Sequence, residues 1–219
     1  MIGQGVLKPS YTQRPGFFAG ILGMLAALAG TLLVMGYVGT EEAIGLRLQE
    51  DLRRSLEQVL PAGGYDNDPS SDYVDLPREG RDALRIYRAR AADQPVAIAF
   101  EVAEPGYADL IHLVMGVSMS GEIIGVRVLN HSETPGLGDK IEVAKHHWML
   151  AFNGLSLANL PLEQWRVKKD GGHFDQFSGA TITPRAVVKA IVGGLRLQQQ
   201  QLSPAQLDTL TNATGEESP

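Results

Sequence analysis

The sequence DQFSGATITP at residues 175–184 says most about how this chain folds. Small and hydroxyl-bearing residues lead directly into an apolar helical pattern that reaches residue 200. Thr183 suits the N-cap of that helix, and Pro184 suits its first position, where a missing N–H costs nothing. Thr181 lies just before the helix, where unpaired N–H groups and the helix dipole favour an anion. The stretch therefore predicts a phosphate site with a threonine hydroxyl inside it. An ordinary loop with a helix cap is the alternative.

A second irregular loop, HSETPGLGDK, lies upstream at residues 131–140. Pro135 and two glycines predict an irregular path with exposed backbone N–H groups. A structural turn without a ligand is the alternative interpretation.

The region before this loop has the residue pattern of β-strands. Alternating or continuous apolar runs separated by turn residues predict strands at 84–89, 96–102, 109–119 and 123–129. Ser120 and Gly121 suggest a tight hairpin between the last two. Adjacent strands without intervening helices indicate an antiparallel sheet, and hence an α+β fold with flanking helices.

Four further segments complete the secondary-structure prediction. Residues 41–60 read as an amphipathic helix that Thr40 could cap and Pro61 stops. Residues 65–80, rich in Asp, Ser, Pro and Gly, read as a surface loop. Residues 141–152 look helical, and residues 164–168 look like a strand.

The N-terminal region predicts a membrane anchor. Residues 17–38 carry no charge and are long enough to cross a bilayer as a helix. Lys8 and Arg14 precede this run, so the amino end is expected in the cytoplasm and the rest outside. A cleaved signal peptide ending at the Ala27-Leu28-Ala29 sequence is the competing interpretation. The apolar run continues past that point, which favours a retained anchor.

Composition excludes several classes of function. The chain has 219 residues, a net charge of -6 and no cysteine, so neither a nucleic-acid surface nor a thiolate metal site is expected. The five histidines show no metal-binding spacing.

The two loops resemble a known family. Asp175-x-x-Ser178-Gly179-Ala180-Thr181 resembles the acceptor motif on which a flavin transferase esterifies FMN phosphate to the last threonine. The loop that begins at His131 is similar to a signature of the G subunit of the Rnf electron-transport complex. That G subunit belongs to an FMN-binding family, which also includes the C subunit of the sodium-pumping NADH:quinone reductase.

The resemblance implies that Thr181 carries FMN as a covalent phosphoester and that the transferase reads the residues before it. It further implies that the upstream loop lines the flavin ring. Lys168 or Lys169 could lie near that ring, although a solvated lysine pair is as reasonable. The cofactor-binding residues predicted in this way are Thr181, Ser178, Gly179, Ala180, Thr183, Glu133, Thr134, Leu137, Gly138 and Lys168.

The implied protein is an electron carrier in an ion-translocating ferredoxin:NAD oxidoreductase. Its partners would be the other membrane subunits, the flavin transferase and lipid, in a bacterial inner membrane. The predicted division is a cytoplasmic N-terminus (1–16), a transmembrane helix (17–38), a linker (39–83), an FMN-binding domain (84–202) and a flexible tail (203–219). An exported, anchored binding or scaffolding module without a cofactor is the main alternative. A flavin-containing sensory protein is another, disfavoured because the chain has no further spans.

Overall fold

The structure, a computed structural model, describes residues 15–78, 81–202 and 206–207. Within these ranges the side chains of residues 15, 36, 38–45, 48 and 81 are not described. The chain divides into two units, Met1–Glu50 and Asp51–Pro219, and each is described by itself.

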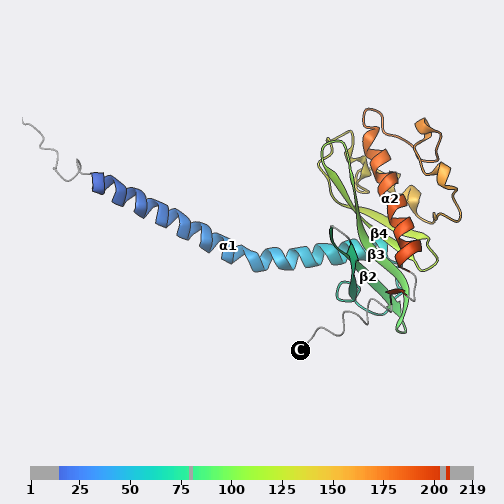
Figure 1. Cartoon of the computed structure of the whole chain (residues 1–219), viewed down its shortest axis with the longest axis horizontal. Coiled ribbons are helices and arrows are strands. Elements are labelled where there is room, and N and C mark those ends of the chain that lie inside the picture. The colour runs from blue at the N-terminus through green and yellow to red at the C-terminus, as the bar shows by residue number, and fades with distance from the viewer. Residues whose placement is uncertain (1–14, 79–80, 203–205, 208–219) are drawn as a thin grey trace, which may run out of the picture. The chain divides into compact units, whose positions relative to one another are not determined.

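Helix α1 (Pro15–Val59) supplies the described part of the first unit and the opening turns of the second (Figure 1). Its segment Gly16–Met35 is long and apolar enough to cross a membrane, and its side chains are exposed. The prediction of a separate helix capped by Thr40 is wrong. The backbone is helical through that position, so the N–H groups that follow already face carbonyls one turn earlier. The helix ends ahead of Pro61, as predicted.

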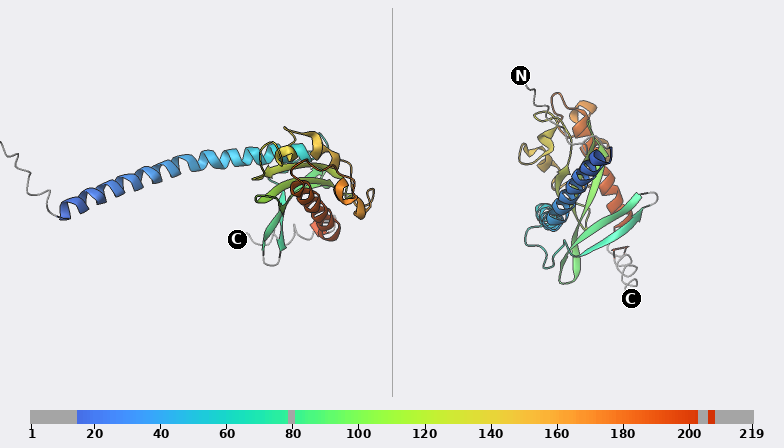
Figure 2. Two further views of the ribbon diagram at one scale, coloured as in Figure 1. Left: turned by 90° about the horizontal axis from the view of Figure 1, so that it is seen from above. Right: turned by 90° about the vertical axis from the view of Figure 1, so that its left-hand side faces the viewer.

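The second unit is built on a five-stranded antiparallel sheet in which each strand pairs with the next in sequence (Figures 1 and 2). Its strands are β1 (Tyr73–Arg78), β2 (Arg81–Ala91), β3 (Gln94–Pro105), β4 (Leu110–Ser118) and β5 (Ile123–Asn130). The β4–β5 turn is tight, with Gly121 at φ 87° and its N–H bonded to the Ser118 carbonyl at 2.9 Å. The predicted antiparallel sheet, its four strands and this hairpin are confirmed.

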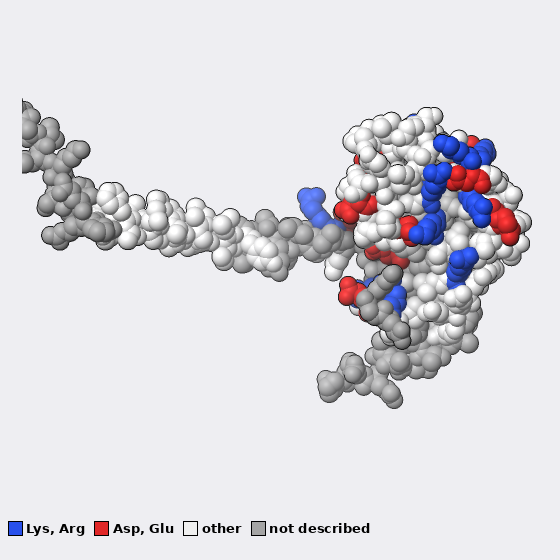
Figure 3. Space-filling view, turned by 45° about the horizontal axis from the view of Figure 1, so that its top comes forward, with Lys and Arg blue, Asp and Glu red and all other residues white. Residues whose placement is uncertain are grey.

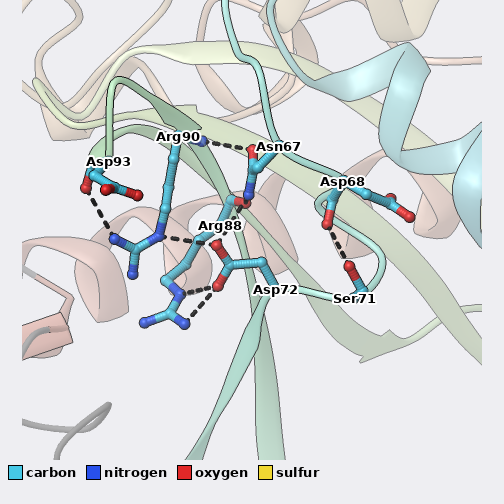
Figure 4. Close-up of polar contacts among 7 residues, drawn as sticks. All are labelled: Asn67, Asp68, Ser71, Asp72, Arg88, Arg90 and Asp93. Atoms are coloured by element: carbon cyan, nitrogen blue, oxygen red, sulfur yellow. Dashed lines mark hydrogen bonds and ion pairs between the residues drawn. The ribbon is translucent and has the colours of Figure 1, made fainter.

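Strand β1 lies inside the segment predicted to be a loop, and that prediction is wrong. The polar residues before β1 do not form a solvent-facing loop. They form hydrogen bonds and ion pairs with residues of β2 (Figure 4). Asn67 donates to the Arg88 carbonyl at 2.9 Å and accepts from the Arg90 N–H at 2.8 Å. The Asp72 carboxylate bonds to both arginines, at 2.7 Å to Arg88 Nε and 2.8 Å to Arg90 Nε. These bonds hold the segment against β2 and set up the β1–β2 pairing.

The two faces of the sheet bury different side chains. Helix α2 (Ile182–Gln201) and the 3-10 segments pack on one face, against large residues such as Ile98 and Phe100. The last turns of α1 pack on the other face, against the small residues Ala97 and Ala99. The alternation along β3 therefore sends bulky side chains to one layer and leaves room for close approach on the other.

Two glycines allow the end of α1 to touch the sheet backbone. A Cβ on Gly116 would lie 1.9 Å from the Val59 carbonyl oxygen, and one on Gly125 would lie 3.0 Å from the Gln58 carbonyl oxygen. A side chain at Gly116 would require the backbone to shift, and one at Gly125 would make a tight contact. The contact lies entirely within the second unit, which begins at Asp51.

The segment between the sheet and α2 is made of short 3-10 helices. They are η2 (Asp139–Ile141), η3 (His147–Phe152), η4 (Leu162–Gln164) and η5 (Lys168–Asp170). The predicted helix at 141–152 is wrong because His146 is extended and its ring accepts the Trp148 N–H, which starts a separate helix. The predicted strand at 164–168 is also wrong. Only Val167 forms a bridge, with Phe174, before the chain turns into η5.

Candidate functional site

The start of α2 is organised around Thr181 and Thr183. The helix begins at Ile182, so Thr181 occupies the N-cap position, although its hydroxyl makes no capping bond. The prediction that Thr183 is the N-cap is wrong. Thr183 is fully buried inside the first turn, and its hydroxyl donates to Glu133 Oε2 instead. The first N–H groups of α2 have no partner within the helix, as at any helix start.

A tight turn presents the residues that precede Thr181. The Ala180 N–H bonds to the Phe177 carbonyl at 3.2 Å, and Gly179 has φ 82°. A turn of this kind requires positive φ at its third residue, which explains the glycine. Phe177 is buried edge-on against Trp148, with ring centroids 5.1 Å apart, and so fixes the turn to the core.

Glu133 joins three separate segments at the other side of the site. Its side chain is 5% exposed. Oε1 accepts the backbone N–H of Tyr107 at 2.8 Å, from the β3–β4 turn, and Oε2 accepts the Thr183 hydroxyl from α2. Gly106 and Gly138 leave room for the carboxylate, since a Cβ on either would come within 2.8 Å of one of its oxygens. Glu133 therefore ties the β3–β4 turn, its own loop and α2 together.

A charged cluster anchors the far end of the same loop. Lys145 Nζ lies 3.1 Å from Asp139 Oδ2 and 2.6 Å from Glu142 Oε1, which His131 Nε2 also approaches to 2.9 Å. The Gly136 N–H and the Lys145 ammonium lower the pKa of Asp139. Lys145 and His131 lower the pKa of Glu142. The two carboxylates of Asp139 and Glu142 are thus held in their ionised form around the turn at Gly136.

The two loops predicted to act together meet at one cavity of about 240 Å³. Leu137 approaches Gly179 closely, so that a Cβ there would lie 3.3 Å from Leu137 Cδ2. Predicted residues that line the cavity are Glu133, Thr134, Leu137, Gly138, Gly179, Ala180, Thr181 and Thr183. Residues some fifty positions apart are therefore brought to one place.

Two predicted residues do not line this cavity. Ser178 stands at the corner of the turn and is exposed. Lys168 Nζ lies 2.7 Å from Asp175 Oδ1, and both side chains are largely exposed. The suggestion that Lys168 lies beside a flavin ring stays a prediction.

Tyr107 and Ile182 line the cavity and were missed from the sequence. Ile182 lies inside the acceptor stretch, where it resembles any first-turn apolar residue. Tyr107 follows a Pro-Gly turn, but only the tertiary bond to Glu133, 26 positions away, brings it to the site.

Large apolar side chains are exposed around this cavity. Tyr107 is 68% exposed, Ile182 is 46% exposed and Leu137 is 42% exposed. An apolar rim beside a helix N-terminus suits a ligand with a flat apolar part and an anionic part. Among the described residues, no group of His, Asp and Glu side chains could hold a metal ion.

Comparison with known proteins places this cavity inside a recognised domain. Residues 106–196 match the model of the FMN-binding domain family. The matched range contains both loops, the Tyr107 turn and most of α2.

Two curated relatives are similar over most of the chain. The G subunit of the ion-translocating oxidoreductase complex of Stutzerimonas stutzeri is 45% identical over 195 residues, 89% of this chain and 86% of that protein. The protein of the same name from Cereibacter sphaeroides is 46% identical over 177 residues, 81% of each chain. Among solved structures, the NqrC of Shewanella oneidensis aligns with a TM-score of 0.43 at 18% identity, covering 72% of this chain and 74% of that one.

Proposed function

This chain belongs to the family of G subunits of the Rnf-type ion-translocating oxidoreductase complex, and we propose that it is an electron-carrier subunit with FMN bound covalently through Thr181. Its FMN-binding domain and its relatives support a redox role within an oxidoreductase complex. FMN, when bound, supplies one- and two-electron chemistry to such a protein.

One observation carries the proposal: Thr181 opens into the cavity around which three apolar side chains are exposed. A phosphate attached at Thr181 would lie at the start of α2, where the helix dipole and the first N–H groups favour a negative charge. Tyr107, Leu137 and Ile182 would cover the apolar ring. The residues present therefore fit both the phosphate end and the ring end of FMN.

The size of the cavity suits a carrier rather than a closed active site. Ligand pockets usually exceed about 300 Å³ and bury most of a ligand. This cavity, at about 240 Å³, is smaller than that, so we expect it to enclose only part of a flavin nucleotide. A partly exposed ring can meet a neighbouring redox group directly, and it needs no catalytic acid or base from this chain.

Attachment requires an external enzyme. A threonine hydroxyl is a weak nucleophile unless a base activates it. Among the residues that the structure describes, none hydrogen-bonds to the Thr181 hydroxyl. We therefore expect a flavin transferase to supply the base. Its contacts would include the exposed Ser178 and Asp175 on the outer side of the turn.

The membrane arrangement is part of the same proposal. Residues 17–38 would span the inner membrane, with the amino end in the cytoplasm and the FMN-binding domain of residues 84–202 on the outer side. Residues 1–16, 39–83 and 203–219 would be the cytoplasmic end, the linker and the tail. A covalent bond would keep the flavin in place where the cytoplasmic pool cannot replace it.

The proposal assigns the chain to a complex that couples ferredoxin–NAD electron transfer to cation movement. Electrons would pass between this flavin and redox groups of neighbouring membrane subunits. The family to which the chain belongs supports these subunits as its partners.

The test is flavin fluorescence of the denatured protein on a gel. The chain is expressed with and without the flavin transferase, together with its Thr181→Ala and Thr183→Ala variants. A fluorescent band is expected only with the transferase and only when Thr181 is present. A dark wild-type band from a transferase-containing host would instead favour an anchored scaffolding module without a cofactor.

A further inference from the structure

A second cavity lies along α2, and its lining is separate from that of the proposed flavin site. It has a volume of about 460 Å³ and lies between α2 and the η4–η5 segment. Its apolar lining comes from Leu162, Trp165, Val167, Val188 and Val192. None of its lining residues lines the cavity at Thr181. We refer to it as the α2 cleft.

The charges around the α2 cleft are only partly matched. Arg185 binds Asp170 through two bonds, at 2.6 and 2.7 Å, and Lys189 pairs with Glu104. Arg166 and Arg196 also line the cleft and are exposed. Among the described residues, no carboxylate forms a salt bridge with either of them. Arg166 is near enough to Asp170 to help lower the pKa of that carboxyl. The cleft has four basic and two acidic lining residues, so it presents a net positive charge beside an apolar surface.

Gly193 leaves open space in the cleft for an incoming group. A glycine inside a helix costs about 1 kcal/mol relative to alanine. The neighbouring Gly194 has a packing reason, since a Cβ there would lie 2.2 Å from Met115 Sδ. A Cβ on Gly193 would meet nothing within 4 Å, and Gly193 lines the cleft. Packing within this chain does not account for the missing side chain, whereas an incoming group would.

We propose that the α2 cleft receives an acidic segment of another subunit of the complex, with an apolar side chain over Gly193 and carboxylates on Arg166 and Arg196. The proposal rests on the chain's place in a multi-subunit complex and not on the flavin bond. It adds a docking surface to the redox site and would fix the domain against its neighbour.

The shape and the charges favour a protein segment over a lipid surface. The cleft is concave with apolar walls, and a flat array of headgroups cannot enter it. On the face drawn in Figure 3, Lys and Arg side chains lie among Asp and Glu side chains, so that face carries no extended basic surface. Lipid attraction of the electrostatic kind requires such clusters of basic residues.

The test is photocrosslinking in membranes of a host that contains the complete complex. A benzophenone amino acid replaces Leu162 at the rim of the cleft, and the products are identified by mass spectrometry. A crosslink to an Asp- or Glu-containing segment of another subunit is expected. The Arg166→Glu/Arg196→Glu double variant should lower its yield about tenfold, because attraction becomes repulsion.

Two matched controls separate docking from general damage. Lys169→Glu makes the same kind of charge change at an exposed residue that does not line the cleft, and the yield should not change. Gly193→Leu should fill the cleft and lower the yield, whereas Gln199→Leu, on an exposed position of the same helix, should not. Gel fluorescence of the same bands reports the flavin bond separately, so the two proposals can fail independently.

Crosslinks to lipid alone, no crosslink at all, or a yield unchanged in the double variant would each overturn the docking proposal.

Discussion

The hydroxyl of Thr183 donates a hydrogen bond to Glu133, which lies fifty positions earlier in the chain. Thr183 is two residues beyond Thr181, and Glu133 belongs to the loop that lines the opposite wall of the cavity. This one bond therefore couples the start of α2 to that loop. It is buried, so water cannot replace it, and the geometry of the site depends on it.

Removing the Thr183 hydroxyl should destabilise the domain. Thr183→Val keeps the shape but leaves a buried carboxylate oxygen without its donor, at a cost of about 1–3 kcal/mol. Thr183→Ser keeps the donor and should lose only about 1 kcal/mol for the deleted methyl group. Urea unfolding of the detergent-purified protein, followed by the fluorescence of the buried Trp148 and Trp165, measures both. Equal losses would show that the hydroxyl contributes nothing.

Gly138 should not tolerate a methyl group, whereas Gly193 should. A Cβ on Gly138 would lie 2.8 Å from Glu133 Oε2 and 3.0 Å from Thr183 Oγ1, so the pair must separate. Gly138→Ala is expected to cost about 1–3 kcal/mol. Gly193→Ala adds a methyl in open space within a helix and should stabilise by about 0.5–1 kcal/mol. Unfolding midpoints of the two variants compare them directly, and a neutral Gly138→Ala would contradict the close approach.

The Asp139 carboxylate should contribute stability at neutral pH that disappears in acid. The Gly136 N–H and Lys145 lower its pKa in the folded state below the unfolded value of about 3.9. A group with a lowered pKa stabilises the fold above its unfolded pKa, and the contribution is lost as pH falls through the folded pKa. Asp139→Asn should therefore be less stable than wild type at pH 7. The difference should shrink as pH falls below about 4 and vanish only below the lowered folded pKa. Urea unfolding across this range tests it; a difference that persists in acid would refute it.

Local patterns in the sequence were enough to predict most of the regular elements. Strands β2 to β5 follow from runs of apolar residues between turn residues, and α2 follows from its apolar stripe. Strand β1 could not be found in this way, because its polar lead-in is held by Asp72, Arg88 and Arg90, a tertiary arrangement. The 3-10 segments have no period that a helix or strand pattern detects.

The predictions for the site also succeeded where local motifs were enough and failed where a distant contact decides. Motif resemblance brought the two loops together, and the structure places eight of the ten predicted residues around one cavity. The role of Thr183 was misjudged because its hydroxyl has a distant partner, which wins over capping the adjacent backbone. Tyr107 could not be predicted, since nothing near it in the sequence points to the cavity.

The most direct test of the account is the intact mass of the protein matured in a host that has the flavin transferase. Wild-type protein should carry the mass of one FMN less one water, and fragmentation should place it on Thr181. Thr183→Ser should carry the same addition, whereas Thr181→Ala should have the mass of the polypeptide alone. A wild-type chain without the addition, or one that carries it on another residue, would contradict the proposed flavin bond.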